Sequence, residues 1–143
     1  MSAEEISVVA DLMSKEVATL ERNDRLSIAD DVMKLGRVRH LPVLGEDGEL
    51  AGIISQRDLL YGSLSSILGY GSVARGKLLS TILVKEAMTT DPIVVAPDTA
   101  IAEAARIMTV NKIGCLPVME GDVLVGIVTE SDFVQLHLAD RAP

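Results

Sequence analysis

The sequence contains few of the residues on which many specialised proteins depend. Among its 143 residues are one cysteine, Cys115, no tryptophan and three aromatic residues, Tyr61, Tyr70 and Phe133. A single thiol excludes an internal disulfide and a zinc site built from several cysteines. Three aromatic side chains cannot form the stacking platforms on which single-stranded nucleic acids bind.

Positive charge and long apolar runs are scarce as well. The chain has 13 Lys and Arg against 21 Asp and Glu, a net charge of −8, which argues against sequence-independent nucleic-acid binding. Residues 1–5 lack the basic and apolar pattern of a secretory signal. The longest uncharged run, Leu59–Ala74, has 16 residues and is too short and too polar to span a bilayer. We therefore expect a cytoplasmic protein that binds neither nucleic acid nor membrane.

Aliphatic residues are abundant, and they recur in an internal repeat. Hydrophobic residues make up 48% of the chain, which excludes disorder. A shift of 75 residues aligns Leu41-Pro42-Val43 with Leu116-Pro117-Val118. A shift of 74 then aligns residues 52–58 with residues 126–132. The sequence predicts two repeats, 8–60 and 83–137, joined by a linker over 61–82, and because each repeat is too short to be stable alone, the two should pack together.

Each repeat has the pattern strand, helix, strand, strand, helix, which predicts a mixed α/β (α+β) fold. Apolar residues spaced three and seven apart indicate the first helix, and Gly-containing turns between aliphatic runs indicate a hairpin. We expect the helices to be N-capped by Asn23-Asp24 and Asp98-Thr99. In order, the expected elements are a strand at 17–20, a helix at 26–36, strands at 41–44 and 50–54, a helix from 58, a strand at 93–95, a helix at 101–111, strands at 115–119 and 123–128, and a helix from 132.

A hydroxyl and a carboxylate three residues apart end the hairpin of each repeat. They are Ser55 and Asp58 in the first repeat and Thr129 and Asp132 in the second. One interpretation is a capping box that satisfies the N–H groups of the following helix. The other places a phosphate or a ribose there, with the carboxylate holding two ribose hydroxyls. The spacing leaves both open, and both can hold at once.

Taken together, these motifs resemble a known family. A Met followed by Ser or Thr, then Leu-Pro-Val, then Gly, two aliphatic residues and Ser/Thr-x-x-Asp, all present twice, is similar to a tandem pair of CBS domains (the cystathionine-β-synthase module). The resemblance covers nearly the whole chain apart from the termini and the linker. It implies two repeats packed through their sheets as a pseudo-two-fold module, with two clefts, that commonly forms a homodimer. It also implies regulation, such as energy sensing, through AMP, ADP, ATP or S-adenosylmethionine, with no required cofactor and with a separate, unknown regulated protein.

The resemblance also implies roles for individual residues. Asp58 and Asp132 match the ribose-binding aspartate, and Ser55 and Thr129 match the hydroxyl that reaches ribose or phosphate. Ser14 and Thr89 match residues near the base, which an aliphatic and backbone wall would recognise. The candidate ligand-binding residues are Ser14, Val17, Ala18, Arg37, Arg39, His40, Ser55, Arg57, Asp58, Thr89, Pro92, Ile93, Lys112, Thr129 and Asp132. Which segment serves which aspartate is left open.

The two repeats differ in charge just before Leu-Pro-Val. The first has Arg37, Arg39 and His40, whereas the second has Lys112 followed by Ile113-Gly114-Cys115. Because Arg makes bidentate contacts with phosphate, we expect the phosphate end of a nucleotide near Arg39 and His40. The other cleft would be weaker, empty or suited to a less charged adenosyl ligand. Ordinary solvated arginines are the competing interpretation.

Other functions fit the sequence less well. Residues 69–74 match the G-x-G-x-x-A dinucleotide fingerprint, but no strand precedes them, so we expect a linker there. No base, nucleophile or metal set converges, so we expect neither an enzyme nor a metal site. The alternative to a ligand sensor is a dimeric interaction module whose clefts bind nothing.

Overall fold

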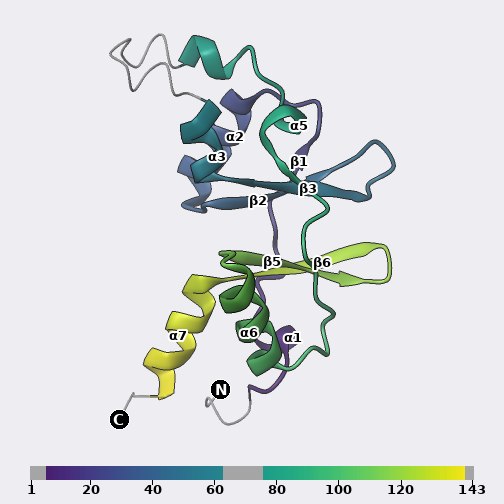
Figure 1. Ribbon diagram of the computed structural model, residues 1–143, viewed down its shortest axis with the longest axis vertical. Helices are drawn as coiled ribbons and strands as arrows, with labels where there is room; N and C mark the ends of the chain where they lie inside the picture. The colour runs from purple at the N-terminus through teal and green to yellow at the C-terminus, as the bar shows by residue number, and fades with distance from the viewer. Residues whose placement is uncertain (1–5, 63–75, 141–143) are drawn as a thin grey trace. The chain divides into compact units, whose positions relative to one another are not determined.

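The computed structural model describes residues 6–62 and 76–140, which form two compact units (Figure 1). Unit 1 comprises Met1–Val17 and Ile93–Pro143, and unit 2 comprises Ala18–Pro92. Each unit thus combines parts of both sequence repeats. The dinucleotide fingerprint at 69–74 and most of the expected linker lie outside the described residues. The repeat boundaries at 8–60 and 83–137 stay a prediction.

Unit 2 is a four-stranded sheet covered by helices. Its strands lie in the order β1-β2-β3-β4, with β1 parallel to β2 and the other neighbours antiparallel. Helices α2 and α3 lie on the same face of the sheet (Figure 1). In chain order the elements are β1 (Leu20–Glu21), α2 (Leu26–Gly36), β2 (His40–Leu44), β3 (Leu50–Ser55), α3 (Gln56–Gly62), α5 (Val84–Ala87) and β4 (Thr89–Thr90).

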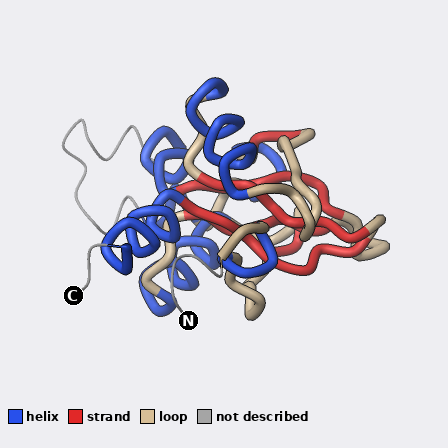
Figure 2. The backbone as a smooth tube through the Cα atoms, turned by 90° about the horizontal axis from the view of Figure 1, so that it is seen from below, coloured by secondary structure: helices blue, strands red, loops and turns tan. Residues whose placement is uncertain are grey.

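Unit 1 repeats this arrangement around one hairpin. Strands β5 and β6 pair antiparallel, an isolated bridge joins Val95 to Val118 in parallel, and another joins Ser14 to Ile127 antiparallel. The hairpin strands are red in Figure 2, with tan loops at their ends. The elements are α1 (Val9–Leu12), α6 (Ile101–Asn111), β5 (Cys115–Glu120), β6 (Val123–Thr129) and α7 (Glu130–Asp140).

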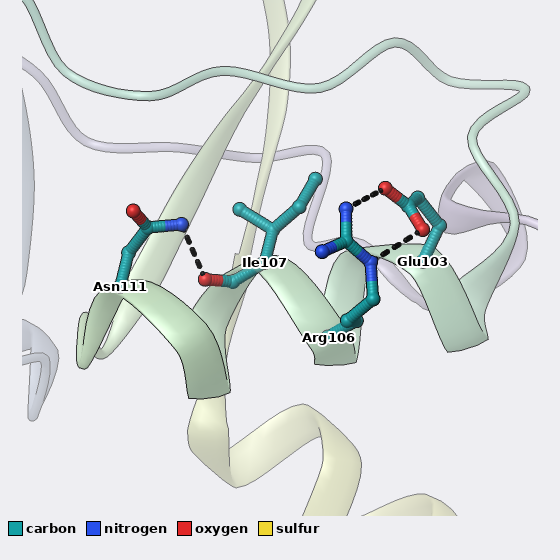
Figure 3. A network of polar contacts seen from close by, with 4 residues as sticks. All are labelled: Glu103, Arg106, Ile107 and Asn111. Atoms are coloured by element: carbon teal, nitrogen blue, oxygen red, sulfur yellow. Dashed lines mark hydrogen bonds and ion pairs between the residues drawn. The ribbon is translucent and has the colours of Figure 1, made fainter.

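Helices α2 and α6 begin and end close to the predicted residues. Both bury the predicted apolar face, and they end at Gly36 and Asn111 as expected. The residues that follow, Arg37 and Lys112, have φ angles of 53° and 54°, in the left-handed region that costs a non-glycine residue roughly 1–2 kcal/mol. At the end of α6, the Asn111 Nδ2 donates to the Ile107 carbonyl at 2.8 Å (Figure 3).

Three local predictions are wrong. The strand expected at 17–20 is only the two-residue β1 at Leu20–Glu21, so it shares a single residue with the prediction. The helices begin after Arg25 and Ala100, and neither residue supplies a side-chain cap. The Asp24 carboxylate accepts from the Glu21 N–H at 2.8 Å, so it closes the turn before the helix instead of capping it. The strand expected at 93–95 is reduced to the single bridge at Val95, because Ile93 and Val94 stay outside the ladder and are 41% and 42% exposed.

Each unit has a hydrophobic core of its own, built from aliphatic residues and methionine. Leu79, which the sequence placed in the linker, belongs to the core of unit 2 and is 1% exposed. The buried core of unit 2 comprises Leu20, Leu26, Ala29, Met33, Leu41, Val43, Ile54, Leu59, Leu79 and Val84. The buried core of unit 1 comprises Val9, Val95, Ala104, Met108, Leu116, Val118 and Val128. Within the described residues, no helix is long and apolar enough to cross a membrane.

Candidate functional site

Each repeat contributes its leading segment, residues 13–18 or 88–93, to the sheet of the other repeat. In unit 2, Thr89 and Thr90 pair with Ile53 and Gly52. In unit 1, the Ser14 N–H donates to the Ile127 carbonyl at 2.9 Å and the Ile127 N–H donates back at 3.0 Å. The structure therefore brings Thr89 together with Ser55 and Asp58, and Ser14 together with Thr129 and Asp132, within single units.

Two glycines make room for the leading segments. A Cβ atom on Gly52 would lie 2.5 Å from the Thr89 carbonyl oxygen and 2.8 Å from the Met88 Sδ. A Cβ atom on Gly126 would lie 2.5 Å from the Met13 Sδ and 2.9 Å from the Ser14 carbonyl oxygen. The group that approaches each glycine backbone closely is therefore the methionine and the carbonyl of a leading segment.

In unit 2, Ser55 and Asp58 form a reciprocal cap at the junction of β3 and α3. The Asp58 Oδ2 accepts from the Ser55 N–H at 2.7 Å and from the Ser55 Oγ at 2.9 Å. The Asp58 N–H donates to the Ser55 Oγ at 3.2 Å. Capping is thus present, and the two bonds that the carboxylate accepts both use Oδ2. Within the described part of the chain, no bond occupies the Asp58 Oδ1.

In unit 1, Thr129 and Asp132 form the same cap with one change. The Asp132 Oδ2 accepts from the Thr129 N–H at 2.8 Å, but the Thr129 Oγ1 is 3.3 Å away. Besides this longer bond to the carboxylate, the Thr129 hydroxyl shares a 2.8 Å hydrogen bond with the Ser131 Oγ. The hydroxyl in unit 1 is therefore already engaged by a neighbour that unit 2 lacks, because Arg57 stands at the position equivalent to Ser131.

The predicted basic residues of unit 2 lie near this cap, around the open end of the β2–β3 hairpin, where β2 begins and β3 ends. His40 pairs with Ser55 across β2 and β3, and the Gln56 N–H donates to the Arg39 carbonyl at 2.8 Å. Arg57 follows directly in α3, and Arg37 occupies the left-handed position after α2. Arg37, Arg39 and Arg57 are exposed, and none of them forms an ion pair with a described residue.

Unit 1 carries little positive charge at the equivalent edge. Cys115 pairs with Thr129, and the Glu130 N–H donates to the Gly114 carbonyl at 3.1 Å, so the backbone matches that of unit 2. Of the four basic residues compared, only Arg37 aligns with another basic residue, which is Lys112. Burial raises the pKa of the Cys115 thiol to about 12, so this side chain stays neutral and acts as a small apolar residue.

The residues expected to form the adenine wall lie where the chain passes from one unit to the other. Val17 ends the first segment of unit 1 and Ala18 begins unit 2, whereas Pro92 ends unit 2 and Ile93 resumes unit 1. Val17 and Pro92 are half-buried, while Ala18 and Ile93 are exposed. Each two-residue wall is therefore divided between the two units.

The sequence reasoning missed Gln56 and Glu130. Their backbone N–H groups join the cap to the residues before Leu-Pro-Val, at 2.8 Å and 3.1 Å. The 74-residue shift aligns Gln56 with Glu130, so the sequence already shows an amide in the first repeat where the second has a carboxylate. Across the described residues, no three His, Cys, Asp or Glu side chains gather in a way that could hold a metal ion.

Comparison with a family model assigns the same two repeats to a known domain. The model described as "CBS domain" matches residues 9–65 and 84–138. These two matches together span more than half of the chain.

Similar proteins extend this likeness over nearly the whole length. A CBS domain-containing protein of Dictyostelium discoideum is 33% identical over 137 residues, which are 95% of this chain and 94% of that one. The crystal structure of CBSX2 in complex with AMP has a TM-score of 0.77 and 29% identity, covering 94% of this chain and 99% of that one. The CBS domain pair of MJ0100, in complex with 5′-methylthioadenosine and S-adenosyl-L-methionine, has a TM-score of 0.74 and 27% identity, covering 92% and 96%.

Proposed function

The chain belongs to the CBS-domain family, and from this premise we propose that it is a regulatory module that binds an adenosine-containing ligand. Binding would be signalled to a separate protein, and the module would itself catalyse no reaction. Two related CBS pairs support this proposal, since one was crystallised with AMP and the other with S-adenosylmethionine and 5′-methylthioadenosine.

The observation that supports the proposal most directly is that each cap uses only one oxygen of its aspartate carboxylate. Asp58 and Asp132 each cap their helix through Oδ2. The Oδ1 atoms accept no bond from any described residue, so they remain available to the two hydroxyls of a ribose. Capping and ligand binding are therefore compatible functions of the same side chain.

In unit 2 the phosphate end of the ligand would lie beside Arg39 and His40. Both residues precede the buried Leu41-Pro42-Val43 segment, and His40 is the ladder partner of Ser55. A guanidinium group without a carboxylate partner suits a phosphate because it donates two parallel hydrogen bonds. Arg37 and Arg57 would add charge from either side, and Thr89 would lie toward the base.

A thermal-shift series tests the binding function. At about 100-fold excess over Kd, a ligand that binds only the folded state stabilises it by about 2.7 kcal/mol, which is several degrees in Tm for a chain of this size. We expect such a shift with AMP, ADP, ATP or S-adenosylmethionine. The absence of a shift with all four at millimolar concentration would overturn the proposal and favour a module whose clefts bind nothing.

The phosphate position has its own variant and control. Replacing both Arg39 and His40 by alanine should remove most of the shift given by AMP or ADP. The control is Arg106→Ala, since the Arg106 guanidinium is already held by the Glu103 carboxylate on α6 (Figure 3) and its loss should leave the shift unchanged. Unchanged nucleotide affinity in the double variant would contradict this placement.

The same family likeness leads us to propose a cytoplasmic homodimer that acts on a separate regulated protein. Light scattering after size exclusion tests the dimer directly. We expect twice the 15.2 kDa mass of one chain, and a monodisperse monomer would contradict the dimer.

A further inference from the structure

The two units carry opposite charge at equivalent positions around their caps. Where unit 2 has Arg39, His40, Gln56 and Arg57, unit 1 has Gly114, Cys115, Glu130 and Ser131. Three of the four exchanges make unit 1 less positive than unit 2. Glycine and serine stand where unit 2 has Arg39 and Arg57, and Glu130 stands where unit 2 has the neutral Gln56. The fourth exchange places the buried Cys115 where unit 2 has His40.

The backbone places these four positions next to the cap in both units. His40 and Cys115 are the ladder partners of Ser55 and Thr129. The Gln56 and Glu130 N–H groups donate to the carbonyls of Arg39 and Gly114. Because both of these backbone contacts occur in each unit, the four positions are structurally equivalent and can be compared side chain by side chain.

These charges are not neutralised within the molecule. Neither Arg39 nor Arg57 forms an ion pair with a described residue, although the whole chain carries a net charge of −8. Glu130 is likewise exposed and without a described cationic partner. A ligand at either cap would therefore meet side-chain charges that have no ion-pair partner among the described residues, positive in unit 2 and negative in unit 1.

We propose that the two caps select adenosine ligands of opposite charge, with Glu130 and Ser131 as the specificity-determining residues of unit 1. Unit 2 takes ligands whose 5′ position bears phosphate. Unit 1 rejects phosphate and takes ligands whose 5′ substituent is neutral or cationic. The inference rests on the proposed adenosine-binding function and adds to it a division of labour between the units.

Isothermal titration of the full chain tests this division with two probes, ADP and the uncharged 5′-methylthioadenosine. In unit 2 the variant is Gln56→Glu with Arg57→Ser, which introduces the unit 1 residues at exposed positions. Losing one cation and gaining one anion should weaken ADP binding roughly tenfold, since exposed charge pairs are worth a few-fold each and arginine–phosphate pairs more. Binding of 5′-methylthioadenosine should change less than about twofold, because that ligand carries no charge at this end.

The reverse exchange in unit 1 is the matched variant. Glu130→Gln with Ser131→Arg should create a second ADP site, raising the stoichiometry from one ADP per chain to two. Two equal ADP sites in the unaltered chain, or unchanged ADP binding in both double variants, would overturn the inference and leave the proposed function intact. Absence of binding by both probes would also overturn the inference, and the proposed function would fail with it only if AMP, ATP and S-adenosylmethionine likewise gave no thermal shift.

Discussion

Single residues decide how closely the segments of this protein approach each other. Gly52 and Gly126 occupy equivalent positions in the two hairpins, and each is covered by a methionine and a backbone carbonyl from a leading segment. A backbone carbonyl cannot move aside as a flexible side chain can. A side chain at either position must therefore push the leading segment away from the sheet.

We predict that Gly52→Ala and Gly126→Ala each lower the free energy of unfolding by about 1–3 kcal/mol, the usual cost of overpacking. Urea denaturation followed by circular dichroism measures the change. Gly36→Ala is the matched control, since its Cβ atom would meet only the Val38 Cγ2 at an ordinary 3.7 Å. In the helix α2 it should raise stability by about 0.5–1 kcal/mol. Equal effects of all three substitutions would contradict the close approach.

A second residue-scale prediction concerns the thiol of Cys115. Its pKa is raised by burial from 9.0 to about 12, and its relative exposure is 7%. Below pH 9 the thiol is neutral in both folded and unfolded chains, so it gives stability no pH dependence. As the pH rises from 9 towards 12, the unfolded chain ionises first. Folding is then progressively disfavoured.

We therefore expect the free energy of unfolding to fall more steeply above pH 9 in the unaltered chain than in Cys115→Ala. Denaturant titrations at a series of pH values measure both slopes. The comparison cancels the lysines and tyrosines that titrate in the same range. Parallel slopes in the two proteins, or rapid alkylation of the native thiol at pH 8, would show that Cys115 is not buried as described.

At the scale of elements, the leading segments are the least regular and the most consequential parts of the fold. The segment at Ser14 joins β6 through a reciprocal pair of backbone hydrogen bonds, and β4 joins β3 in the same manner. Neither segment forms a strand longer than two residues. Their positions depend on backbone pairing with the opposite repeat.

Two substitutions at Ser14 separate its backbone role from its hydroxyl. Ser14→Pro removes the N–H that donates to the buried Ile127 carbonyl, and leaving that acceptor unpaired should cost about 1–3 kcal/mol. Ser14→Ala keeps the backbone bonds and changes an exposed side chain, so its cost should stay within about 0.5 kcal/mol. Thermal unfolding measures both, and equal stability of the two variants would contradict the pairing.

The sequence predicted well the elements that depend on local spacing. The helices α2 and α6 follow from apolar residues three and seven apart, and the hairpins follow from aliphatic runs around glycine turns. The three-residue spacing of Ser55 and Asp58 predicted a capping box, a ligand site or both. The structure contains the cap, which is compatible with a ligand site at the same residues. The tandem CBS pair, inferred from these motifs, is confirmed by the family match.

Local sequence patterns could not predict which distant segments of the chain pair with each other. The strand expected at Ile93–Val95 contains three β-branched aliphatic residues, yet only Val95 finds a partner strand. The assignment of Ser14 to Asp132 and of Thr89 to Asp58 was likewise open, because two equivalent repeats offer two equally plausible pairings. The covering of Gly52 by Met88 required knowledge of that assignment.

For the whole molecule, the exchange of leading segments means that neither repeat contains a complete candidate site. Unit 2 combines the cap of the first repeat with Thr89 of the second, and unit 1 combines the cap of the second with Ser14 of the first. A ligand bound at either cap would contact chain from both repeats.

The charge of the whole molecule directs where a nucleotide can bind. With a net charge of −8, the chain as a whole repels phosphate. Arg37, Arg39 and Arg57 have no ion-pair partner among the described residues and offset this charge locally, near the Asp58 cap. We therefore expect AMP to bind in unit 2.

A crystal structure of the unaltered protein grown with millimolar AMP tests this placement most directly. The account predicts the ribose hydroxyls on the Asp58 carboxylate, at hydrogen-bond distances of about 2.6–3.2 Å, with the phosphate against Arg39 and His40. AMP ordered away from Asp58, or bound with its phosphate beside Glu130 in unit 1, would contradict it.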